Sequence, residues 1–496
     1  MRYRDFLRRR YRAMLAYTGA ILALMGLLYL LPLALVAVYP AEAHCAGGFA
    51  AAGVPLALVG LALWRALRPA EPVSLTVQEG MVMVVGVWLT AIAVGTLPFL
   101  INSGMTFTQA VFETTSGWTT TGLTVFELNG APRVMLFYRS LLQLIGGAGF
   151  AIVALSAITG PSGIGLVAAE GRTEQLAPHV RQSAEIVLRL YLGYVIAGAL
   201  ALRLAGMGWF DAVNHAFTAV ATGGFSTQPA SIGHWQNPVI EAVIIALMLL
   251  GSLNFLTAFI LFRRKLRPVV RNGEVRLVAL VLPVAIALIA VSLAAAFQLE
   301  PLQALRTAAF EAVSALSGTG FNIVNYRGLS HFALLILIGL MTIGGGSGST
   351  AGGIKQARIY MLYKGIAWEF RRAFLPAHTV NEPVLWQGEN RTFLDDRRLR
   401  QVALFVAIYL SVFFAGSAWV AAHNFDLEEA LFEFASALGT VGLSIGVTAA
   451  DAPATLLWGL IAGMFLGRLE FFAVFIGVLK LVSDMPSLLG RRANGG

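Results

Sequence analysis

Cysteine and charged side chains are both scarce in this chain. Its 496 residues include one cysteine, Cys45, which excludes an intramolecular disulfide and a thiolate metal cluster. Charged residues make up 12% of the chain and hydrophobic residues 57%, a balance typical of a membrane protein. The histidines lack the HxxxH spacing of a metal site, and no Walker sequence and no GxGxxG after a strand occurs. We therefore expect that the chain is not an enzyme and that it carries no organic cofactor.

Apolar runs long enough to cross a bilayer recur along the whole sequence. About 20 apolar residues span the hydrocarbon core as a helix, and ten segments approach that length. They predict an all-α polytopic membrane protein. The predicted crossings are 14–38, 47–63, 80–101, 134–158, 183–204, 238–262, 275–297, 334–343 continuing past a break, 402–422 and 456–482.

Basic side chains give the chain its net charge of +9, but they are concentrated in alternate loops. They precede the first predicted crossing and follow the second, fourth, sixth, eighth and tenth, as in the run "FRRKLRPVVRNGEVR" from Phe262. This alternation is the positive-inside pattern of membrane proteins. It predicts that both termini are cytoplasmic, and it argues against a nucleic acid as the partner of the basic residues.

One sequence pattern occurs four times, at intervals of about 100 residues. Every copy has a glycine ten residues after its start, then a large apolar residue and a small polar one. Each copy lies between an outward-going and an inward-going crossing and is too short to cross, so four re-entrant segments are predicted. The copies are "FETTSGWTTTGLT" from Phe112, "NHAFTAVATGGFS" from Asn214, "FEAVSALSGTGFN" from Phe310 and "FEFASALGTVGLS" from Phe432.

The predicted fold is therefore four membrane–pore–membrane repeats around a single pore, preceded by an N-terminal pair of transmembrane helices. Glycine permits an extended backbone whose carbonyl groups face the axis, and rings of carbonyl oxygens replace the hydration shell of K⁺. Glu113, Glu311 and Glu433 share one position of the repeat, which His215 fills in the second copy. We expect these side chains to hold the pore helices rather than to bind ions. Asp211 and Asp426 are predicted N-caps, and Pro301 is placed in a first helical turn.

The stretch "IGGGSGSTAGGIK", residues 343–355, interrupts the second helix of the third repeat. Six glycines within thirteen positions cannot form a stable helix, although apolar sequence flanks them. A breakable segment below the re-entrant turn predicts a gate. The other repeats have the shorter stretches "GGAGF", "GSLNF" and "GRLEF" at the equivalent places. Arg468 lies within the last of these, where a buried charge is costly and usually functional.

These motifs resemble the Trk/Ktr/HKT superfamily of bacterial, fungal and plant K⁺ transport proteins over nearly the whole chain. The N-terminal helix pair, residues 14–67, is closer to the TrkH-type membrane subunit than to the Ktr type. The resemblance implies K⁺ uptake across the bacterial inner membrane through a channel-like pore. It also implies a homodimer in the lipid bilayer and a cytosolic regulatory subunit that binds NAD, ATP or ADP. In plant relatives, a serine at the position of Gly122 is associated with Na⁺ preference, so the glycine here favours K⁺.

The same resemblance assigns K⁺-binding and gating residues. The selectivity filter comprises Thr120, Thr121, Gly122, Leu123, Thr222, Gly223, Gly224, Phe225, Gly318, Thr319, Gly320, Phe321, Thr440, Val441, Gly442 and Leu443. The gate comprises Gly344, Gly345, Gly346, Ser347, Gly348, Ser349, Thr350, Gly352, Gly353, Lys355 and Arg468.

The predicted parts follow one another along the chain. The loop that precedes the last repeat is basic and polar, and it suits docking of a cytoplasmic partner. The parts are the helix pair 1–75, repeat one 76–170, repeat two 171–272, repeat three 273–375 with its gating loop 344–354, the cytoplasmic loop 376–400 and repeat four 401–496.

Other interpretations remain open at this point. A Na⁺-permeable protein or a Na⁺/H⁺-coupled K⁺ symporter of the same fold would favour a membrane-embedded carboxylate, for which Glu470 is the candidate. A polytopic membrane enzyme would need clustered carboxylates or histidines at one membrane face. Plainer alternatives are helix packing for the threonine and glycine columns, a kinked helix for the loop, an ion pair for Arg468 and a surface position for Lys355.

Overall fold

The computed structural model describes residues 3–71, 73–149, 180–376, 383–387 and 390–488. The chain divides into two compact units. Unit 1 comprises Met1–Trp118, Val125–Arg189 and Leu469–Gly496, and unit 2 comprises Thr119–Thr124 and Leu190–Arg468. All four glycine turns of the repeats therefore belong to unit 2.

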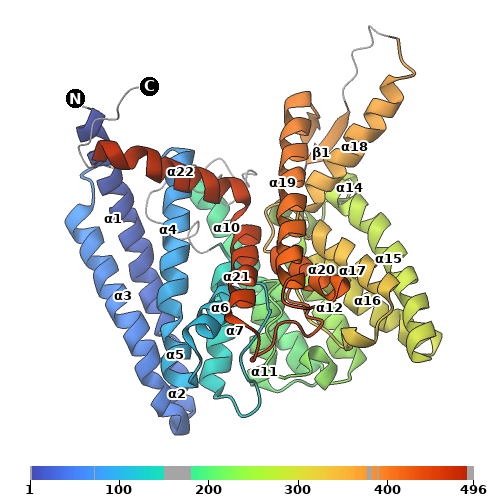
Figure 1. Ribbon diagram of the computed structural model, residues 1–496, viewed down its shortest axis with the longest axis horizontal. Helices are drawn as coiled ribbons and strands as arrows, with labels where there is room; N and C mark the ends of the chain where they lie inside the picture. Colours follow the sequence, from blue (N-terminus) through green and yellow to red (C-terminus); the bar gives the residue numbers. More distant parts are fainter. Residues whose placement is uncertain (1–2, 72, 150–179, 377–382, 388–389, 489–496) are drawn as a thin grey trace. The chain divides into compact units, whose positions relative to one another are not determined.

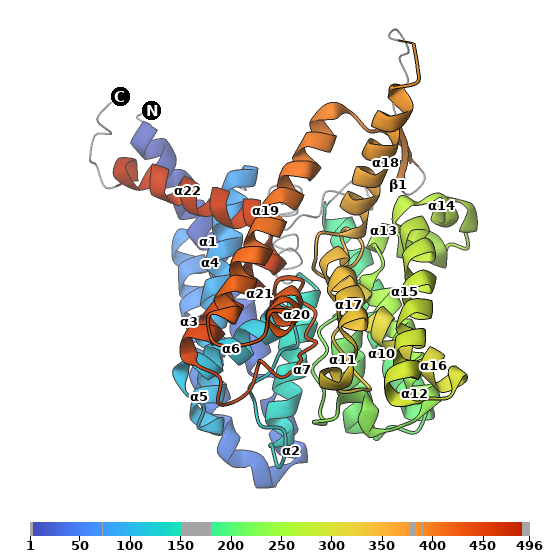
Figure 2. The same cartoon turned by 45° about the vertical axis from the view of Figure 1, so that its right-hand side comes forward.

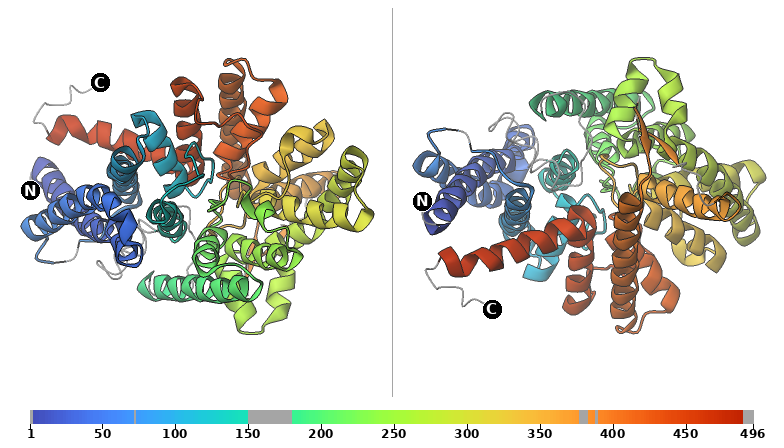
Figure 3. Two further views of the ribbon diagram at one scale, coloured as in Figure 1. Left: turned by 90° about the horizontal axis from the view of Figure 1, so that it is seen from below. Right: turned by 90° about the horizontal axis from the view of Figure 1, so that it is seen from above.

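Unit 1 is built on a closely packed pair of helices, α1 and α3, which lie side by side in the views of Figure 3. Glycine makes this approach possible, because a Cβ on Gly26 or Gly60 would overlap the backbone of the other helix. The helices of unit 1 are α1 (Tyr3–Tyr29), α2 (Leu33–Val38), η1 (Pro40–Cys45), α3 (Ala46–Leu67), α4 (Val77–Gly95), α5 (Leu97–Ser103), α6 (Phe107–Trp118), α7 (Arg133–Gly147) and α22 (Phe471–Leu488).

Unit 2 contains most of α10 and the helices from α11 to α21, except Leu469, the last residue of α21. Helices α15, α16 and α17 pack against one another, as Figure 2 shows. The helices of unit 2 are α10 (Val180–Leu204), α11 (Trp209–Val220), η3 (Ser231–His234), α12 (Pro238–Ser252), α13 (Phe255–Phe262), α14 (Leu266–Arg271), α15 (Gly273–Phe297), α16 (Pro301–Ser317), η4 (Tyr326–Gly328), α17 (His331–Ile343), α18 (Gln356–Arg372), α19 (Asp396–Ala421), α20 (Leu427–Leu438) and α21 (Ala454–Leu469).

A short antiparallel hairpin, β1 (Val384–Gln387) and β2 (Asn390–Phe393), lies within the stretch predicted as a cytoplasmic loop. Leu385 and Leu394 form a small apolar cluster with Met361 of α18 and Val402 of α19. The hairpin lies near these two helices in Figure 1. The sequence analysis did not predict this structure, because its four-residue strands are shorter than the apolar runs that signal a sheet.

The prediction of a multi-pass helical membrane protein is confirmed. Among the described residues, seven helices are long and apolar enough to cross a membrane, or eight if the bent pair α12 and α13 counts as one. Helices α17 and α21 are shorter apolar helices. The predicted crossing 134–158 lies partly outside the described residues.

Two predicted crossings are not single straight helices. Helices α12 and α13 meet at an angle of 115°. Helix α21 ends at Leu469 and α22 begins at Phe471, because Glu470 between them adopts a left-handed backbone with φ of 59°. An apolar run indicates burial in lipid but not continuity of the helical hydrogen bonds, so the sequence did not reveal the sharp bend between α12 and α13.

The four re-entrant helices are α6, α11, α16 and α20, of 12, 12, 17 and 12 residues. At 1.5 Å per residue, none reaches across a bilayer. Asp426 caps α20 through a capping box with Glu429, and Pro301 begins α16, as predicted. The prediction for Asp211 is wrong. The N-cap of α11 is Gly208, and the Asp211 carboxylate instead accepts a hydrogen bond of 2.6 Å from Thr227.

Candidate functional site

The four glycine turns share one unusual backbone conformation. Each copy of the repeat has a glycine ten residues after its start. This glycine and the residue two positions before it both have positive φ, whereas the residue between them does not. Alternation of left- and right-handed conformations allows the carbonyl groups of successive residues to face the same side. The φ values are 55° and 96° at Thr120 and Gly122, 50° and 74° at Thr222 and Gly224, 68° and 86° at Gly318 and Gly320, and 50° and 99° at Thr440 and Gly442.

Three of these left-handed positions are threonines, which makes the turns strained. A β-branched side chain rarely adopts positive φ, and each such residue costs on the order of 1–3 kcal/mol. Thr120, Thr222 and Thr440 all carry this strain, whereas the third repeat has Gly318. Strain of this kind persists where surrounding structure fixes the backbone, and it concentrates at functional sites.

The four turns close into a ring in the order of the sequence. A Cβ on Gly122 would overlap the carbonyl oxygen of Gly223, and a Cβ on Gly224 would overlap that of Thr319. The ring continues in the same way from Gly320 to Val441 and from Gly442 to Thr121. Each glycine thus abuts the carbonyl group that immediately precedes the glycine of the next repeat. Any side chain at these four positions would push the ring apart.

Two threonine hydroxyls of this ring have no protein partner among the described residues. Thr120 Oγ1 and Thr440 Oγ1 are buried and accept or donate no hydrogen bond. Thr222 Oγ1, at the equivalent position, lies 2.9 Å from Thr350 Oγ1. Buried hydroxyls are usually satisfied, so unsatisfied ones in one ring indicate a place for a polar ligand or an ion.

In three of the four pore helices, a buried glutamate at one position of the repeat holds the chain that follows the turn. Glu113 accepts from the Val125 amide at 3.1 Å. The equivalent bonds are 2.8 Å from Ile323 to Glu311 and 3.1 Å from Ile445 to Glu433. Each of these amides lies three residues after the glycine of its turn. The expected supporting role of the three glutamates agrees with these bonds.

Additional donors saturate these carboxylates. Arg139 Nε lies 2.7 Å from Glu113, and both side chains are almost fully buried. Tyr326 donates to Glu311, and Ser444 donates to Glu433 at 2.8 Å. In the second repeat, His215 Nε2 lies 3.0 Å from the hydroxyl of Ser226, two residues after the glycine of that turn.

The glycine-rich segment between α17 and α18 lies directly against the ring. Thr350 Oγ1 contacts Thr222 Oγ1 of the second turn and donates to the Gly251 carbonyl at 2.9 Å. A Cβ on Gly352 would overlap Thr440 of the fourth turn, and a Cβ on Gly318 would lie 3.5 Å from Ala351. Residues 350–352 therefore pack against the left-handed residues of the second, third and fourth turns.

Backbone hydrogen bonds fix the rest of this segment. The Gly346 amide donates to the Ser252 carbonyl at 2.9 Å, and the Ser347 amide donates to the Glu274 carboxylate at 2.7 Å. Gln356 Nε2 donates to the Gly344 carbonyl at 3.0 Å. The segment is ordered by contacts from other helices, because its own sequence cannot form a helix.

Two basic side chains that were predicted to belong to the gate, Arg468 and Lys355, also form hydrogen bonds with this segment. An Arg468 nitrogen donates to the carbonyl of Thr350, at the tip of the segment. Lys355 Nζ donates to the carbonyl of Ala351, and its backbone has φ of 84°. Both side chains thus contact the segment through backbone carbonyls, so neither serves only as a surface charge.

The helices that follow the turns are interrupted at equivalent places in the second, third and fourth repeats. Gly251 and Gly467 pack against the carbonyl groups of Val220 and Leu438, which are the last residues of α11 and α20. In the first repeat Gly146 packs in the same way against Trp118. The first, second and fourth glycine stretches therefore share one packing contact, with the end of the pore helix of their own repeat.

Comparison with protein families assigns this architecture. A model described as "TrkH: Cation transport protein" matches residues 49–487. The chain belongs to the TrkH family of cation transport proteins. Individual TrkH relatives agree with this family model. The chain is 32% identical over 416 residues to the Trk system potassium uptake protein TrkH of Halomonas elongata, covering 81% of this chain and 85% of that protein. It is 33% identical over 435 residues to the Escherichia coli K12 protein of the same description, covering 84% and 88%.

A solved TrkH structure has the same fold. The crystal structure of the potassium transporter TrkH from Vibrio parahaemolyticus matches with a TM-score of 0.82 and 28% identity. The match covers 95% of this chain and 98% of that one. The predicted superfamily and the TrkH-type branch are therefore confirmed, as is the predicted fold class.

Some residues of this TrkH-family site were missed by the sequence analysis. Arg139 is a charged residue inside a predicted crossing, and that signal could have marked it as a functional position. Gln356 and Tyr326 carry no such signal, since polar residues at helix ends and in loops are common. Their roles follow only from the contacts described above.

Proposed function

We propose that this chain takes up K⁺ across the bacterial inner membrane, with the four glycine turns as its selectivity filter. The observation that supports this most strongly is the closed ring of glycines and carbonyl groups, one contact from each repeat to the next. A ring of four carbonyl oxygens suits a weakly hydrated cation such as K⁺. The unpartnered hydroxyls of Thr120 and Thr440 add oxygen ligands. Relatives described as potassium uptake proteins support the same cation.

The driving force requires no chemistry in this chain. A membrane potential is worth about 2.3 kcal/mol per elementary charge per 100 mV, which draws a cation inward. The carboxyl ends of the pore helices carry partial negative charge that favours a cation near them. We therefore assign the chain no enzymatic activity, and its ligand is the transported ion itself.

The segment 344–354 acts as the gate in this proposal. Its tip packs against three of the four turns and is held by Arg468, so in this conformation it obstructs the path beyond the filter. The guanidinium charge of Arg468 also repels a cation there. Opening requires the contacts of Thr350 and Gly352 to break. The glycine content of the segment makes the required backbone change inexpensive.

A partner is proposed to open this gate. The segment continues into α18, which packs with the hairpin and α19 in a region that the positive-inside pattern places in the cytoplasm. We infer that a cytosolic nucleotide-binding subunit binds there, and that two copies of the chain form a homodimer with cytoplasmic termini. The words "Trk system" in the names of relatives support a multi-component transporter.

Flux of ⁸⁶Rb⁺ into proteoliposomes tests filter and gate together. The samples are the purified chain and a variant that lacks Gly344–Gly353, each with K⁺ or Na⁺ as competitor. We expect flux that K⁺ but not Na⁺ suppresses, and that increases on deletion. If Na⁺ competes as well as K⁺, the proposed K⁺ selectivity is wrong and the pore is permeable to Na⁺. Absence of flux in both samples would contradict the proposed pore.

A further inference from the structure

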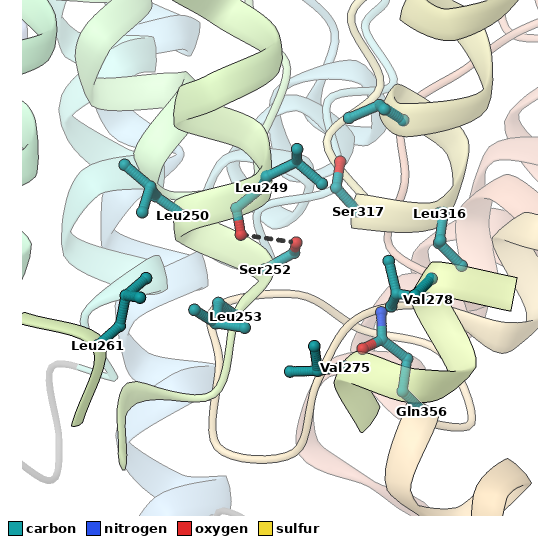
Figure 4. Close-up of a pocket in the computed structure, with 12 residues that line it drawn as sticks. Leu249, Leu250, Ser252, Leu253, Leu261, Val275, Val278, Leu316, Ser317 and Gln356 are labelled. Atoms are coloured by element: carbon teal, nitrogen blue, oxygen red, sulfur yellow. Dashed lines mark hydrogen bonds between the residues drawn. The ribbon is translucent and has the colours of Figure 1, made fainter. Parts of the chain in front are cut away.

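An apolar cavity lies beside the gate segment, within unit 2. It has a volume of about 330 Å³ and is lined by residues of α12, α13, α15 and α16 and by Gln356 at the start of α18. Figure 4 shows Leu253, Leu261, Val275 and Val278 at its wall. It is larger than the roughly 150 Å³ apolar cavity that suffices to bind benzene. Its size is thus sufficient for part of a hydrocarbon chain.

The few polar groups at the wall are already bonded to protein. Ser252 Oγ donates to the Leu249 carbonyl at 3.1 Å, and Ser317 Oγ lies 2.7 Å from Thr319 Oγ1. The side-chain amide of Gln356 donates to the Gly344 carbonyl. The remaining wall consists of leucine, valine and alanine side chains. An occupant is therefore recognised by apolar contact and not by hydrogen bonds.

The helices that form the cavity also face the lipid. Leu249 at its wall is 38% exposed, and Leu280, next to the lining residue Ala279, is 67% exposed. Helix α15 is apolar enough to cross the membrane, and only 17% of its most apolar window is buried. Such a surface is surrounded by the hydrocarbon of the bilayer. A lipid acyl chain is therefore the apolar molecule available to fill the cavity.

Exposed basic residues lie within a few positions, in the sequence, of residues that line the cavity. Arg263 and Arg264 come two and three residues after Leu261, and Arg276 comes one residue after Val275. Lys265, Arg267 and Arg271 lie between them and are exposed as well. The acidic residue of this stretch, Glu274, is buried and accepts from Ser347. Clusters of four to eight basic residues beside a membrane helix attract anionic lipid headgroups.

We propose that this cavity binds one acyl chain of an anionic phospholipid whose headgroup meets the basic residues 263–276. The bound acyl chain stabilises the gate segment in the conformation described above. Ser252 accepts from the Gly346 amide at 2.9 Å, and Gln356 holds Gly344, so two wall residues are also anchors of the segment. A chain in the cavity keeps both anchors in place. This second statement rests on the proposed gate, whereas the binding site does not.

Photolabelling tests the site in the full-length protein. The probes are phosphatidylglycerol and phosphatidylcholine with a diazirine in one acyl chain, and mass spectrometry locates the labelled residues. We expect phosphatidylglycerol to label the cavity wall several-fold more than phosphatidylcholine. The variant Val278→Trp, which fills the cavity, abolishes this labelling. The matched variant Val284→Trp changes an exposed position of the same helix and leaves it intact.

A second variant distinguishes recognition of the lipid headgroup from binding of the acyl chain, because it leaves the cavity unaltered. Arg263→Gln combined with Arg264→Gln lowers the preference for phosphatidylglycerol and leaves phosphatidylcholine labelling unchanged. An unchanged preference would overturn the role of the basic residues and favour a protein partner for them. Labelling at Val284 but not at the cavity wall in the unmodified protein would overturn the site itself.

Rubidium flux then tests this stabilisation of the gate segment. Raising the phosphatidylglycerol content of the proteoliposomes lowers flux several-fold in the unmodified protein but not in Val278→Trp. Cavity labelling without any effect of lipid on flux would overturn this stabilisation alone. Labelled protein without flux under any condition would contradict the proposed function and not the lipid site.

Discussion

At the scale of single residues, the ring depends on glycine for space as well as for backbone conformation. Gly122, Gly224, Gly320 and Gly442 combine positive φ with direct contact to a carbonyl oxygen of the next repeat. Two demands on one residue explain why the sequence pattern is most regular here.

We predict that Gly122→Ala lowers ⁸⁶Rb⁺ flux in proteoliposomes by about ten-fold or more, because the new Cβ displaces Gly223 and opens the ring. A left-handed alanine alone costs about 1–2 kcal/mol. The control is Gly130→Ala, which has φ of 72° but no atom within 4 Å of the new Cβ. Equal loss of flux in both variants would attribute the effect to backbone strain and contradict the ring contact.

A buried carboxylate behind a turn is a second residue-scale feature with a measurable consequence. Glu433 accepts from Ser444, Ile445 and Thr448. We predict that Glu433→Gln destabilises the protein by about 1–3 kcal/mol, because an amide group then faces donors that lose their acceptor. The measurement is thermal unfolding in detergent, together with competition of ⁸⁶Rb⁺ flux by Na⁺.

The control for this substitution lies on the same helix. Glu428 of α20 is partly exposed and pairs with the exposed His331, so Glu428→Gln should have little effect. If the two substitutions lower stability equally, the backbone bonds of Glu433 do not support the turn.

At the scale of elements, an interruption of a helix places polar backbone beside the glycine turns. Non-helical backbone at membrane depth is tolerated only where protein or water surrounds it. The segment between α17 and α18 meets this condition through bonds to Ser252, Glu274 and Gln356. Its conformation is therefore set by neighbouring helices, and those contacts must change when it moves.

We predict that Gly352→Ala increases basal ⁸⁶Rb⁺ flux several-fold, because the Cβ collides with Gly439 and Thr440 and displaces the segment from the turn. Gly348→Ala is the matched control in the same segment, with φ of 69° and open space around the Cβ. A higher flux in Gly348→Ala than in Gly352→Ala would contradict the role of this contact.

Arg468 provides a second test of the same element. Arg468→Ala removes both a donor to Thr350 and a positive charge, and we expect it to raise basal flux. Arg468→Lys keeps the charge and shortens the side chain. Low flux in the lysine variant would show that charge repulsion dominates, whereas high flux would assign the effect to the hydrogen bond. Unchanged flux in the alanine variant would exclude the residue from the gate.

At the scale of the whole molecule, the two units contain different elements of the repeats. Unit 2 contains all four turns and the gate segment, whereas the N-terminal helix pair lies in unit 1. The pair is held by close helix packing at glycines, with Arg10 Nε 2.7 Å from Glu79 of α4. Among the described residues, none of this helix pair takes part in the contacts between glycine and carbonyl oxygen that form the ring.

We predict that Gly26→Leu lowers the thermal stability of the protein in detergent but leaves the K⁺ over Na⁺ preference of the remaining flux unchanged. The leucine side chain would overlap the backbone at Ala57 and separate α1 from α3. Gly47→Leu on α3 is the control, since nothing lies within 4 Å of its Cβ. A change in ion preference in Gly26→Leu would mean that the helix pair shapes the filter.

The sequence by itself determined the repeats, the re-entrant helices and the residue types of the turns. These features are local: apolar runs set the helices, and glycine and threonine at fixed spacing set the backbone of each turn. The sequence also predicted the helix interruption at residues 344–355, because a segment with six glycines does not form a stable helix.

The tertiary structure alone decided which groups meet. The contacts of Gly122 with Gly223, of Thr222 with Thr350 and of Glu113 with Arg139 join residues between 26 and 128 positions apart. Such contacts depend on how helices pack, and helix packing is not encoded by any single stretch of sequence. The same reason explains the misplaced cap at Asp211, whose carboxylate accepts a hydrogen bond from Thr227 in the chain after the turn.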